Sequence, residues 1–186
     1  MKNLGTVTLV TDRLILRRFE LKDAPFMFKN WASDEEVTRF LTWQKHENIG
    51  VTEWVINSWI ENYTDEKYYQ WAIVLKEIDQ PVGSISVVRI NESIGEYEVG
   101  YCMGKPWWGK GIMAEALIEV KRFLFDEVGA KRVKAVHDVN NPNSGRVMVK
   151  AGFAYCERLH KGAQNNQGVV DIDVYIIKKG SVASPV

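Results

Sequence analysis

Two glycines separated by one residue, Gly109 and Gly111, lie where an alternating strand pattern changes to a helical one. The strand pattern covers Tyr97 to Met103, and the helical pattern covers Ile112 to Glu127. Glycine lets a backbone approach a ligand closely, and the first N–H groups of a helix have no acceptors within that helix. Because the helix dipole also favours negative charge there, the turn predicts a phosphate or pyrophosphate site, to which Lys110 would add a cation. A tight structural corner is the alternative.

A second segment, from Asn140 to Phe153, carries the signals of a complete short helix. Asn141 suits the N-cap, Pro142 suits the first helical position, and Gly152 suits the residue that ends the helix. Structural requirements alone therefore account for these residues. They do not explain why the helix follows the glycine turn at this distance.

Alternating apolar residues predict seven strands. These cover Arg13–Phe19, Tyr68–Leu75, Val82–Ile90, Tyr97–Met103, Arg132–His137, Phe153–Leu159 and Val169–Ile177. Helices are expected over 21–31, 34–41, about fifteen residues around 51–59, 112–127 and 143–151. The order predicts one α+β domain over residues 1–179, with a mixed, mostly antiparallel sheet flanked by helices. Residues 180–186 are expected to form a loose tail.

Five of the seven tryptophans fall between Trp31 and Trp71. Four apolar residues in this region share helical spacing and one predicted helix face: Val51, Trp54, Val55 and Trp59. Aromatic side chains at this spacing usually face the interior, so we expect them to pack in the core. The functional alternative is that Phe40 and Trp43, between two helices, line the mouth of a substrate site.

The chain of 186 residues carries 24 basic and 24 acidic side chains, so its formal net charge is zero. A general nucleic-acid binder would be strongly basic, so no nucleic-acid partner is expected. No apolar stretch approaches the roughly 18 to 20 residues of a membrane helix, so no membrane partner is expected. With only Cys102 and Cys156 and no signal peptide, we expect a reduced, cytoplasmic protein.

The zero net charge hides an asymmetry. Residues 20–66 carry ten acids and four bases, a balance of −6, whereas residues 102–161 carry eleven bases and six acids, a balance of +5. Opposite charge in two parts of one domain is consistent with an anionic and a cationic substrate.

Several other chemistries lack their motifs in this sequence. The glycine turn is not a P-loop, and no third glycine completes a dinucleotide-binding Gly-x-Gly-x-x-Gly. There is no Gly-x-Ser-x-Gly elbow of a serine hydrolase. His46, His137 and His160 are widely separated, so no metal site is expected. Cys102 is expected to be a packed thiol rather than an acyl carrier.

Five blocks occur in a specific order and at compatible distances. They are Thr11–Arg17 (TDRLILR), Glu98–Tyr101 (EVGY), Trp108–Ala116 (WGKGIMAEA), Asn141–Phe153 and Asp171–Tyr175. Together they resemble the GNAT superfamily of N-acetyltransferases. The first and last blocks resemble its ribosomal-protein-alanine N-acetyltransferase branch. The resemblance covers nearly the whole chain, from about residue 7 to residue 179.

The resemblance implies a GNAT-like sheet that splays between the fourth and fifth strands, with acetyl-CoA as co-substrate and no metal. The pyrophosphate would lie on backbone N–H groups of the glycine turn, and the pantetheine would pair with the strand at 98–103. The implied cofactor-binding residues are Val99, Gly100, Tyr101, Trp108, Gly109, Lys110, Gly111, Ile112, Met113, Ala114, Asn141 and Ser144. Trp108 and Met113 depart from the superfamily's usual residues but leave the backbone donors intact.

Acetyl transfer to an amine needs a neutral amine, polarisation of the thioester oxygen and a proton for the departing thiolate. A strand N–H between Val99 and Cys102 is the candidate for polarising the carbonyl. Glu98 is the candidate base that takes the amine proton, because relatives often carry a carboxylate there, and Glu96 is its reserve. For both residues, an ordinary solvated carboxylate is the alternative.

The sequence lacks the residue that most often protonates the thiolate in this superfamily. Many superfamily members have a tyrosine seven residues after the asparagine at 141, where this chain has Met148. Ser144 is therefore the candidate acid, although it also suits the first turn of a helix. Tyr101 and Tyr155 remain open alternatives.

These observations predict an acetyl-CoA-dependent N-acetyltransferase acting on a primary amine by direct attack in a ternary complex. The acceptor would be a protein N-terminal α-amine or a small-molecule amine. One alternative is a detoxifying acetyltransferase of an aminoglycoside, amino acid or polyamine, and another is a non-catalytic acyl-CoA sensor. The loop 161–168 and the helices within 34–63 are expected to frame the acceptor. The branch resemblance suggests a homodimer.

Overall fold

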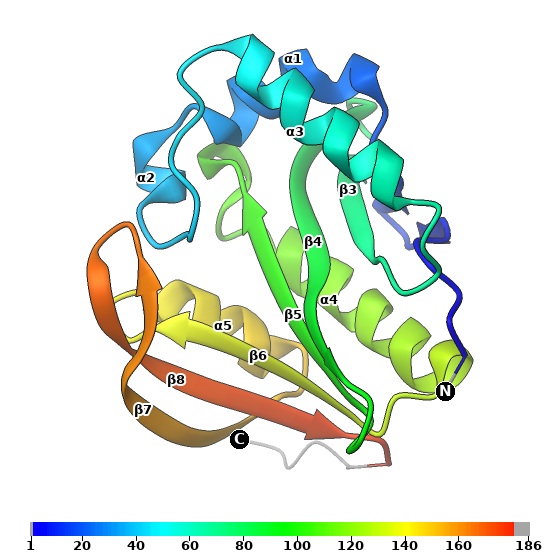
Figure 1. Ribbon diagram of the computed structural model, residues 1–186, viewed down its shortest axis with the longest axis vertical. Coiled ribbons are helices and arrows are strands. Elements are labelled where there is room, and N and C mark those ends of the chain that lie inside the picture. The colour runs from blue at the N-terminus through cyan, green and yellow to red at the C-terminus, as the bar shows by residue number, and fades with distance from the viewer. Residues whose placement is uncertain (1, 181–186) are drawn as a thin grey trace.

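The computed structural model describes residues 2–180, which contain one eight-stranded sheet (Figure 1). Its strands are β1 (Leu9–Val10), β2 (Leu14–Arg17), β3 (Gln70–Leu75), β4 (Gln80–Asn91), β5 (Glu96–Met103), β6 (Arg132–Asp138), β7 (Ala154–Asn165) and β8 (Gly168–Lys178). The order across the sheet is β1-β2-β3-β4-β5-β6-β8-β7, and only β5 and β6 run parallel. The predicted α+β class with a mixed, mostly antiparallel sheet is therefore confirmed.

Helices cover both faces of this sheet (Figure 1). The α-helices are α1 (Ala24–Met27), α2 (Glu35–Thr38), α3 (Ile49–Asn62), α4 (Ile112–Phe123) and α5 (Pro142–Lys150). Short 3-10 or π segments flank them: η1 (Leu21–Asp23), η2 (Phe28–Ala32), η3 (Lys105–Trp107) and η4 (Leu124–Val128). The helices α1 to α3 lie over one face, whereas α4 and α5 lie over the other.

The side chains of β3 point alternately to the two faces of the sheet, which shows why the sheet needs an apolar core on each face. Every residue of this strand is buried. Trp71 and Ile73 belong to the main core under α4 and α5, whereas Ala72 and Val74 belong to a second core under α1 to α3. Successive strand side chains point to opposite faces, so a strand that is apolar throughout requires helices on both sides.

The sheet splays between β5 and β6, which were the fourth and fifth predicted strands. These strands pair only where residues 96–99 face residues 132–135. Beyond that point β6 continues to pair with β8 as far as Asp138, while β5 continues along β4 as far as Met103. The two strands diverge in Figure 1. The predicted splay is confirmed.

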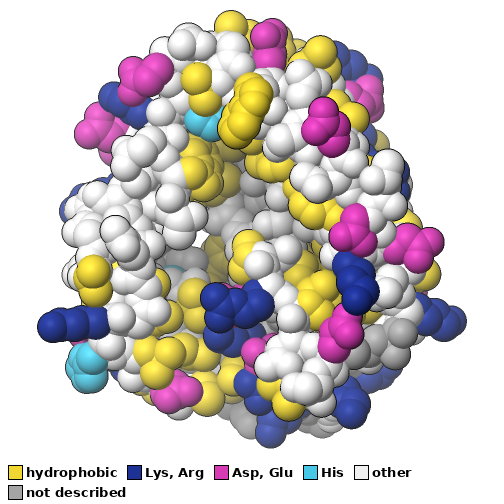
Figure 2. All heavy atoms as spheres, viewed as in Figure 1, with side chains coloured by type: hydrophobic (Ala, Val, Ile, Leu, Met, Phe, Trp, Pro, Cys, Tyr) yellow, Lys and Arg dark blue, Asp and Glu magenta, His cyan; other side chains and the backbone are white. Residues whose placement is uncertain are grey.

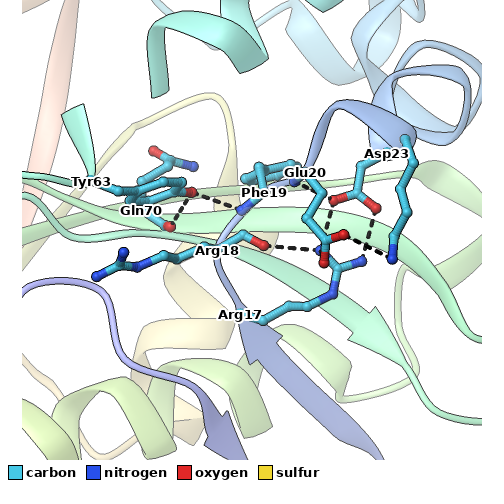
Figure 3. Close-up of polar contacts among 8 residues, drawn as sticks. Arg17, Arg18, Phe19, Glu20, Asp23, Tyr63 and Gln70 are labelled. Carbon is cyan, nitrogen blue, oxygen red and sulfur yellow. Dashed lines mark hydrogen bonds and ion pairs between the residues drawn. The ribbon is translucent and has the colours of Figure 1, made fainter. Parts of the chain in front are cut away.

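A buried ion pair and a tyrosine hold the corner between β2 and the helices (Figure 3). The carboxylate of Asp23, which is 1% exposed, accepts hydrogen bonds of 2.7 and 2.8 Å from the two terminal nitrogens of Arg17. The hydroxyl of Tyr63 accepts from the Phe19 N–H and donates to the Gln70 carbonyl. Burial raises the pKa of Tyr63 to about 12, so this hydroxyl stays protonated and bridges the two segments.

The strand predictions missed one strand and ended another too early. Strand β1 was not predicted, because its two residues are too few for a detectable alternation. The predicted loop 161–168 is instead the end of β7 and the start of β8, joined by a turn at residues 166–167. Since β7 is the edge strand and is exposed along most of its length, it needs no alternating apolar residues.

The helix expected around residues 51–59 exists as α3, and the predicted packing is confirmed for Val55 and Trp59 but was wrong for Val51 and Trp54. The inward stripe consists of Thr52, Val55, Ile56 and Trp59. Trp54 lies midway in the chain between Thr52 and Ile56, so it points away from their face of the helix and is 72% exposed. Val51 is also exposed. The tail predicted at 180–186 lies outside the described residues, apart from Gly180. Within residues 2–180, no helix combines the length and hydrophobicity needed to cross a bilayer.

Candidate active site

The glycine turn precedes α4 with the geometry that only glycine adopts readily. Gly109 and Gly111 both have a φ of 75°, in the left-handed region. Gly111 is the N-cap of α4, and the first helical bond runs from the Glu115 N–H to the Gly111 carbonyl. The N–H groups of residues 112–114 therefore precede the first helical bond and form a donor set for an anion.

The N-terminal arm braces this turn from the side. The guanidinium of Arg13 donates a 3.0 Å hydrogen bond to the Lys110 carbonyl and a 2.6 Å bond to the Glu115 carboxylate. The same carboxylate accepts from the Thr11 hydroxyl at 2.6 Å. The block at residues 11–17 therefore supports the glycine turn rather than lining the cavity.

A cavity of about 450 Å³ lies where β5 and β6 diverge, with the glycine turn in its wall. Nine residues predicted to bind substrate or cofactor line it: Phe40, Tyr101, Trp108, Gly109, Gly111, Met113, Ala114, Asn141 and Ser144. Val99, Gly100, Lys110 and Ile112 are neighbours of these residues in the chain but do not contribute to the described lining. The structure thus brings the glycine turn, the end of β5 and the start of α5 to one cavity.

The backbone of β5 presents free groups to the splay. The Gly104 N–H donates to Val82 of β4, so the Met103 carbonyl, in the same peptide, points away from β4. The indole N–H of Trp108 donates to that carbonyl at 2.6 Å. Tyr101, two residues earlier, directs its N–H and carbonyl to the same side, where β6 no longer pairs with β5.

Two hydroxyl groups meet in the cavity wall. The Tyr101 hydroxyl donates to the Ser144 carbonyl at 2.9 Å, and the Ser144 hydroxyl donates to the Tyr101 oxygen at 3.1 Å. Burial raises the pKa of Tyr101 well above its usual value, although the bond from Ser144 acts in the opposite direction. Tyr101 is thus a protonated hydroxyl at neutral pH. Met148 is 1% exposed in the main core and does not line this cavity.

Asn141 occupies the predicted N-cap of α5, but its side chain makes no capping hydrogen bond. The caps of two other helices do use their side chains, since Asp34 caps α2 and Asn48 caps α3. The amide of Asn141, which lines the cavity, is therefore available to a ligand.

The predicted base lies beside the cavity rather than in its described lining. Glu98 points to the sheet face opposite Tyr97 and Val99, whose side chains pack in the main core. Its carboxylate is 2.9 Å from the ammonium of Lys134 on β6, in the paired part of the two strands. The reserve residue, Glu96, forms the equivalent ion pair with Arg132.

This side of the sheet is left open by α1 to α3 over the lower halves of β4, β5 and β6 (Figure 1). The exposed Val88 of β4 lies on it. The space-filling view shows the same side hollowed at its centre, with hydrophobic side chains along the upper rim of the hollow (Figure 2).

The two residues expected at the substrate mouth separate in the structure. Phe40 lines the cavity. Trp43 packs instead against the second core and against the ring of His46, with 5.3 Å between the ring centroids. Cys102 also lines the cavity, and burial raises the pKa of its thiol to about 11, which keeps it protonated and a poor nucleophile.

Eleven lining residues lie outside the predicted cofactor-binding and substrate-binding set: Glu36, Val37, Leu41, Cys102, Met103, Asn140, Pro142, Asn143, Arg146, Val147 and Lys150. Arg146 and Lys150 lie four residues apart on α5 and share a face with Asn143, so helical spacing contained a signal for them. The first three come from α2 and the segment after it, which are distant in the chain. Glu36 pairs with Lys105 of η3 at 2.7 Å and so joins α2 to the segment that leads into the glycine turn.

No group of three or more His, Cys, Asp or Glu side chains is arranged to hold a metal ion in the described part of the chain. The donors around the cavity are backbone N–H groups, hydroxyls, amides and cations. These groups suit an anionic ligand that carries an acyl chain.

A splayed sheet, an extended strand with free backbone groups and a helix start with free N–H groups form a site suited to an anionic acyl carrier, and so indicate an acyl-group transferase. Residues 13–154 match the family model described as an acetyltransferase (GNAT) domain. The chain therefore belongs to the GNAT acetyltransferase family, and it is an N-acetyltransferase.

Known relatives span nearly the same length. An uncharacterized N-acetyltransferase p20 of Bacillus licheniformis is 28% identical over 91% of this chain and 93% of its own. The [ribosomal protein uS5]-alanine N-acetyltransferase of Escherichia coli is 28% identical over 81% of this chain and 80% of its own. The microcin C7 self immunity acetyltransferase MccE, solved with acetyl-CoA and AMP, has the same fold. Its TM-score is 0.78 at 22% identity, covering 90% of this chain and 93% of its own.

Proposed function

We propose that this enzyme moves an acetyl group from acetyl-CoA to a primary amine by direct attack within a ternary complex. The observation that carries the proposal is the edge of β5, whose unpaired backbone groups at Tyr101 face a cavity that begins at the glycine turn. Acetyl-CoA supplies an activated acetyl thioester on a long, polar, anionic carrier. The donor set in the cavity matches that chemistry.

Different residues would hold different parts of the co-substrate. The N–H groups of residues 112–114 would bind the pyrophosphate, together with the backbone of Gly109 and Gly111. The amide-like pantetheine would pair with the free edge of β5, as an added strand does. Asn141 and Ser144 would contact it from α5.

The N–H of Tyr101 would polarise the thioester carbonyl. A strand N–H directed into a partly enclosed cavity is already oriented, so it stabilises a developing negative oxygen without reorganisation. Removing one such donor typically costs about 10²- to 10³-fold in rate.

Glu98 would take the proton of the amine, directly or through a water molecule. Its carboxylate lies on the open side of β5, three residues before Tyr101, and Lys134 holds its orientation. The demand on this base depends on the acceptor. An α-amine with a pKa near 8 is neutral in roughly a tenth of molecules at pH 7, whereas a lysine costs about 4.6 kcal/mol to deprotonate.

The Tyr101–Ser144 hydroxyl pair would supply the proton to the departing thiolate. Tyr101 is held protonated by burial and is hydrogen-bonded at both its donor and acceptor sides. A proton from solvent then passes through the Ser144 hydroxyl to Tyr101, and Glu98 releases the amine proton to solvent, so that both groups return to their starting states. Because Met148 is enclosed in the core, the tyrosine usual at that position in the superfamily has no counterpart on α5.

An α-amine is the acceptor that we favour, because about a tenth of its molecules are already neutral at pH 7, so its deprotonation demands less of the base than that of a lysine. The relative that acetylates an alanine of ribosomal protein uS5 supports this choice. A small-molecule amine is the second candidate, and the likeness to a self immunity acetyltransferase supports it. A homodimer and a cytoplasmic location remain predictions.

A screen of acceptors tests the proposal. Purified enzyme and acetyl-CoA are incubated with peptides that carry different free N-termini, with the same peptides blocked at the N-terminus, and with polyamines, amino acids and aminoglycosides. Thiol release reports transfer. We expect release with free but not blocked peptides. Release with small amines alone would favour detoxification, tight acetyl-CoA binding without any release would favour a sensor, and failure to bind acetyl-CoA would overturn the proposal.

A further inference from the structure

The tip of the β7–β8 hairpin contacts both sides of the cavity through two neighbouring asparagines. Asn165 ends β7, and Asn166 begins the turn that leads into β8. Apart from these contacts, the outer strand β7 is largely exposed. Hydrogen bonds, rather than apolar packing, therefore decide where the tip lies.

Asn166 is bonded through its backbone and through both ends of its side chain. Its backbone N–H donates to the Leu41 carbonyl at 3.1 Å, and its side-chain nitrogen donates to Thr38 and Trp43 carbonyls at 2.9 and 2.7 Å. Its side-chain oxygen accepts from Gln44 at 2.7 Å. One residue thus holds the segment that follows α2, and this segment contributes Phe40 and Leu41 to the cavity wall.

Asn165 makes the matching contact on the other side. Its side-chain nitrogen donates to the carboxylate of Asp138 at 2.8 Å. Asp138 is 5% exposed at the end of β6, and its second oxygen accepts the Asn140 backbone N–H at 2.8 Å. Its backbone carbonyl accepts the N–H of Asn141. The hairpin tip is therefore tied to the turn that presents Asn141 to the cavity.

We propose that Asn165 and Asn166 are positioning residues that join the two sides of the cavity. Through Asn166 the tip fixes the wall that holds Phe40, and through Asn165 and Asp138 it fixes the turn that holds Asn141. The first wall faces the acceptor and the second faces acetyl-CoA, an assignment that rests on the proposed function. We call the hydrogen bonds of Asn165 and Asn166 to these two sides the tie. The tie sets the separation of the two substrates, and a misplacement of about 1 Å costs on the order of 10²-fold in rate.

Asn166→Ala tests the tie directly, with Asn166→Asp as an isosteric companion. The aspartate variant keeps the volume of the side chain but places a carboxylate oxygen against two carbonyl oxygens. If hydrogen bonding matters, Asn166→Asp is at least as damaging as Asn166→Ala. Gln164→Ala is the matched control, because Gln164 lies on the same hairpin, is exposed and has no side-chain hydrogen bond within the described residues.

Amide hydrogen exchange gives a readout that does not need an acceptor. In both Asn166 variants we expect exchange over residues 38–44 to rise about tenfold or more, while the strands β3 to β6 keep their protection. Asn165→Ala should raise exchange over residues 139–141 instead. Unchanged protection of residues 38–44 in Asn166→Ala would overturn the tie, and wild-type exchange is expected for Gln164→Ala.

Kinetics then test the positioning role with the acceptor identified by the screen. In Asn166→Ala we expect the acceptor KM to rise about tenfold, with the acetyl-CoA dissociation constant close to that of the wild type. An increase in exchange with unchanged kcat/KM for the acceptor would overturn the positioning role. If the wild-type enzyme acetylates no amine at all, the proposed function fails, whereas the exchange result still decides whether the tie exists.

Discussion

Tyr101 and Ser144 lie 43 positions apart in the chain and share two hydrogen bonds, of 2.9 and 3.1 Å, across the wall of the cavity. Tyr101 comes from β5, whose backbone faces the splay, and Ser144 comes from the first turn of α5. The pair therefore joins the strand that would bind the acetyl group to the helix that would bind the rest of the co-substrate.

Tyr101→Phe removes the hydroxyl of this pair and leaves the ring. We expect kcat to fall roughly 10²-fold, because positioned proton transfer contributes about 10²- to 10⁴-fold. The acetyl-CoA dissociation constant, measured by calorimetry, should change little, since the backbone of β5 is unaltered. Ser144→Ala should show a smaller loss. A weaker affinity with unchanged kcat would instead assign the pair to binding.

The pH dependence follows from the raised pKa of Tyr101. A tyrosine whose pKa is raised in the folded state stays protonated beyond its usual value near 10. With an α-amine acceptor, kcat/KM should rise with pH and level off near pH 8, where the amine becomes neutral. No decline due to Tyr101 should appear up to pH 10. A falling limb between pH 8 and 10 that Tyr101→Phe abolishes would contradict this account.

Glu98 and Lys134 form one ion pair, so the two partners can be compared. We expect Glu98→Gln to lower kcat by about 10²-fold or more, because the amide accepts no proton from the amine. Lys134→Met removes the cation that orients Glu98 but keeps the carboxylate, so kcat should fall clearly less than in Glu98→Gln. Equal losses in both variants, measured by thiol release at saturating substrates, would reduce Glu98 to a structural partner. Glu96→Gln tests the reserve base in the same assay.

Gly111→Ala should weaken acetyl-CoA binding. An L-residue with a side chain at φ 75° costs about 1 to 2 kcal/mol, and relaxing that strain displaces the first N–H groups of α4. We expect roughly tenfold weaker binding, whereas Gly111→Asn should lose less, because asparagine tolerates this region better. Gly152→Ala is the control, since Gly152 has φ 86° at the far end of α5. The Gly152→Ala variant should lose a similar free energy of unfolding, measured by chemical denaturation, but bind acetyl-CoA as tightly as the wild type.

Gly145→Ala should destabilise the protein through a specific neighbour. A β-carbon at Gly145 would lie 2.6 Å from Nε2 of His137, which is buried and bonded through Nδ1 to the Asp138 carbonyl. Overpacking of this kind typically costs about 1 to 3 kcal/mol. His137→Ala in the same chain should recover much of that loss in thermal unfolding. Strictly additive effects of the two substitutions would show that the clash does not cause the loss.

Most of the sheet could be predicted because its inner strands must alternate or be apolar throughout. Every residue of the strand at 70–75 is buried, so burial constrains both of its faces, whereas in the strand at 96–103 the buried Tyr97, Val99 and Met103 alternate with less buried residues. The outer strand β7 carries no such constraint, and its polar segment from Lys161 to Asn165 was mistaken for a loop. The same reasoning explains Trp54, because an exposed tryptophan and a buried one have the same helical spacing.

The amino-acid sequence by itself determined the glycine turn before α4 and the start and end of α5, because each depends on residues within a few positions of the chain. Only the tertiary structure decided that Tyr101 meets Ser144, that Glu98 pairs with Lys134, and that Trp43 packs inward while Phe40 lines the cavity. These pairings depend on where β5 and β6 part and on which side each strand residue faces. A one-residue change in register would reverse them, and no local pattern records that choice.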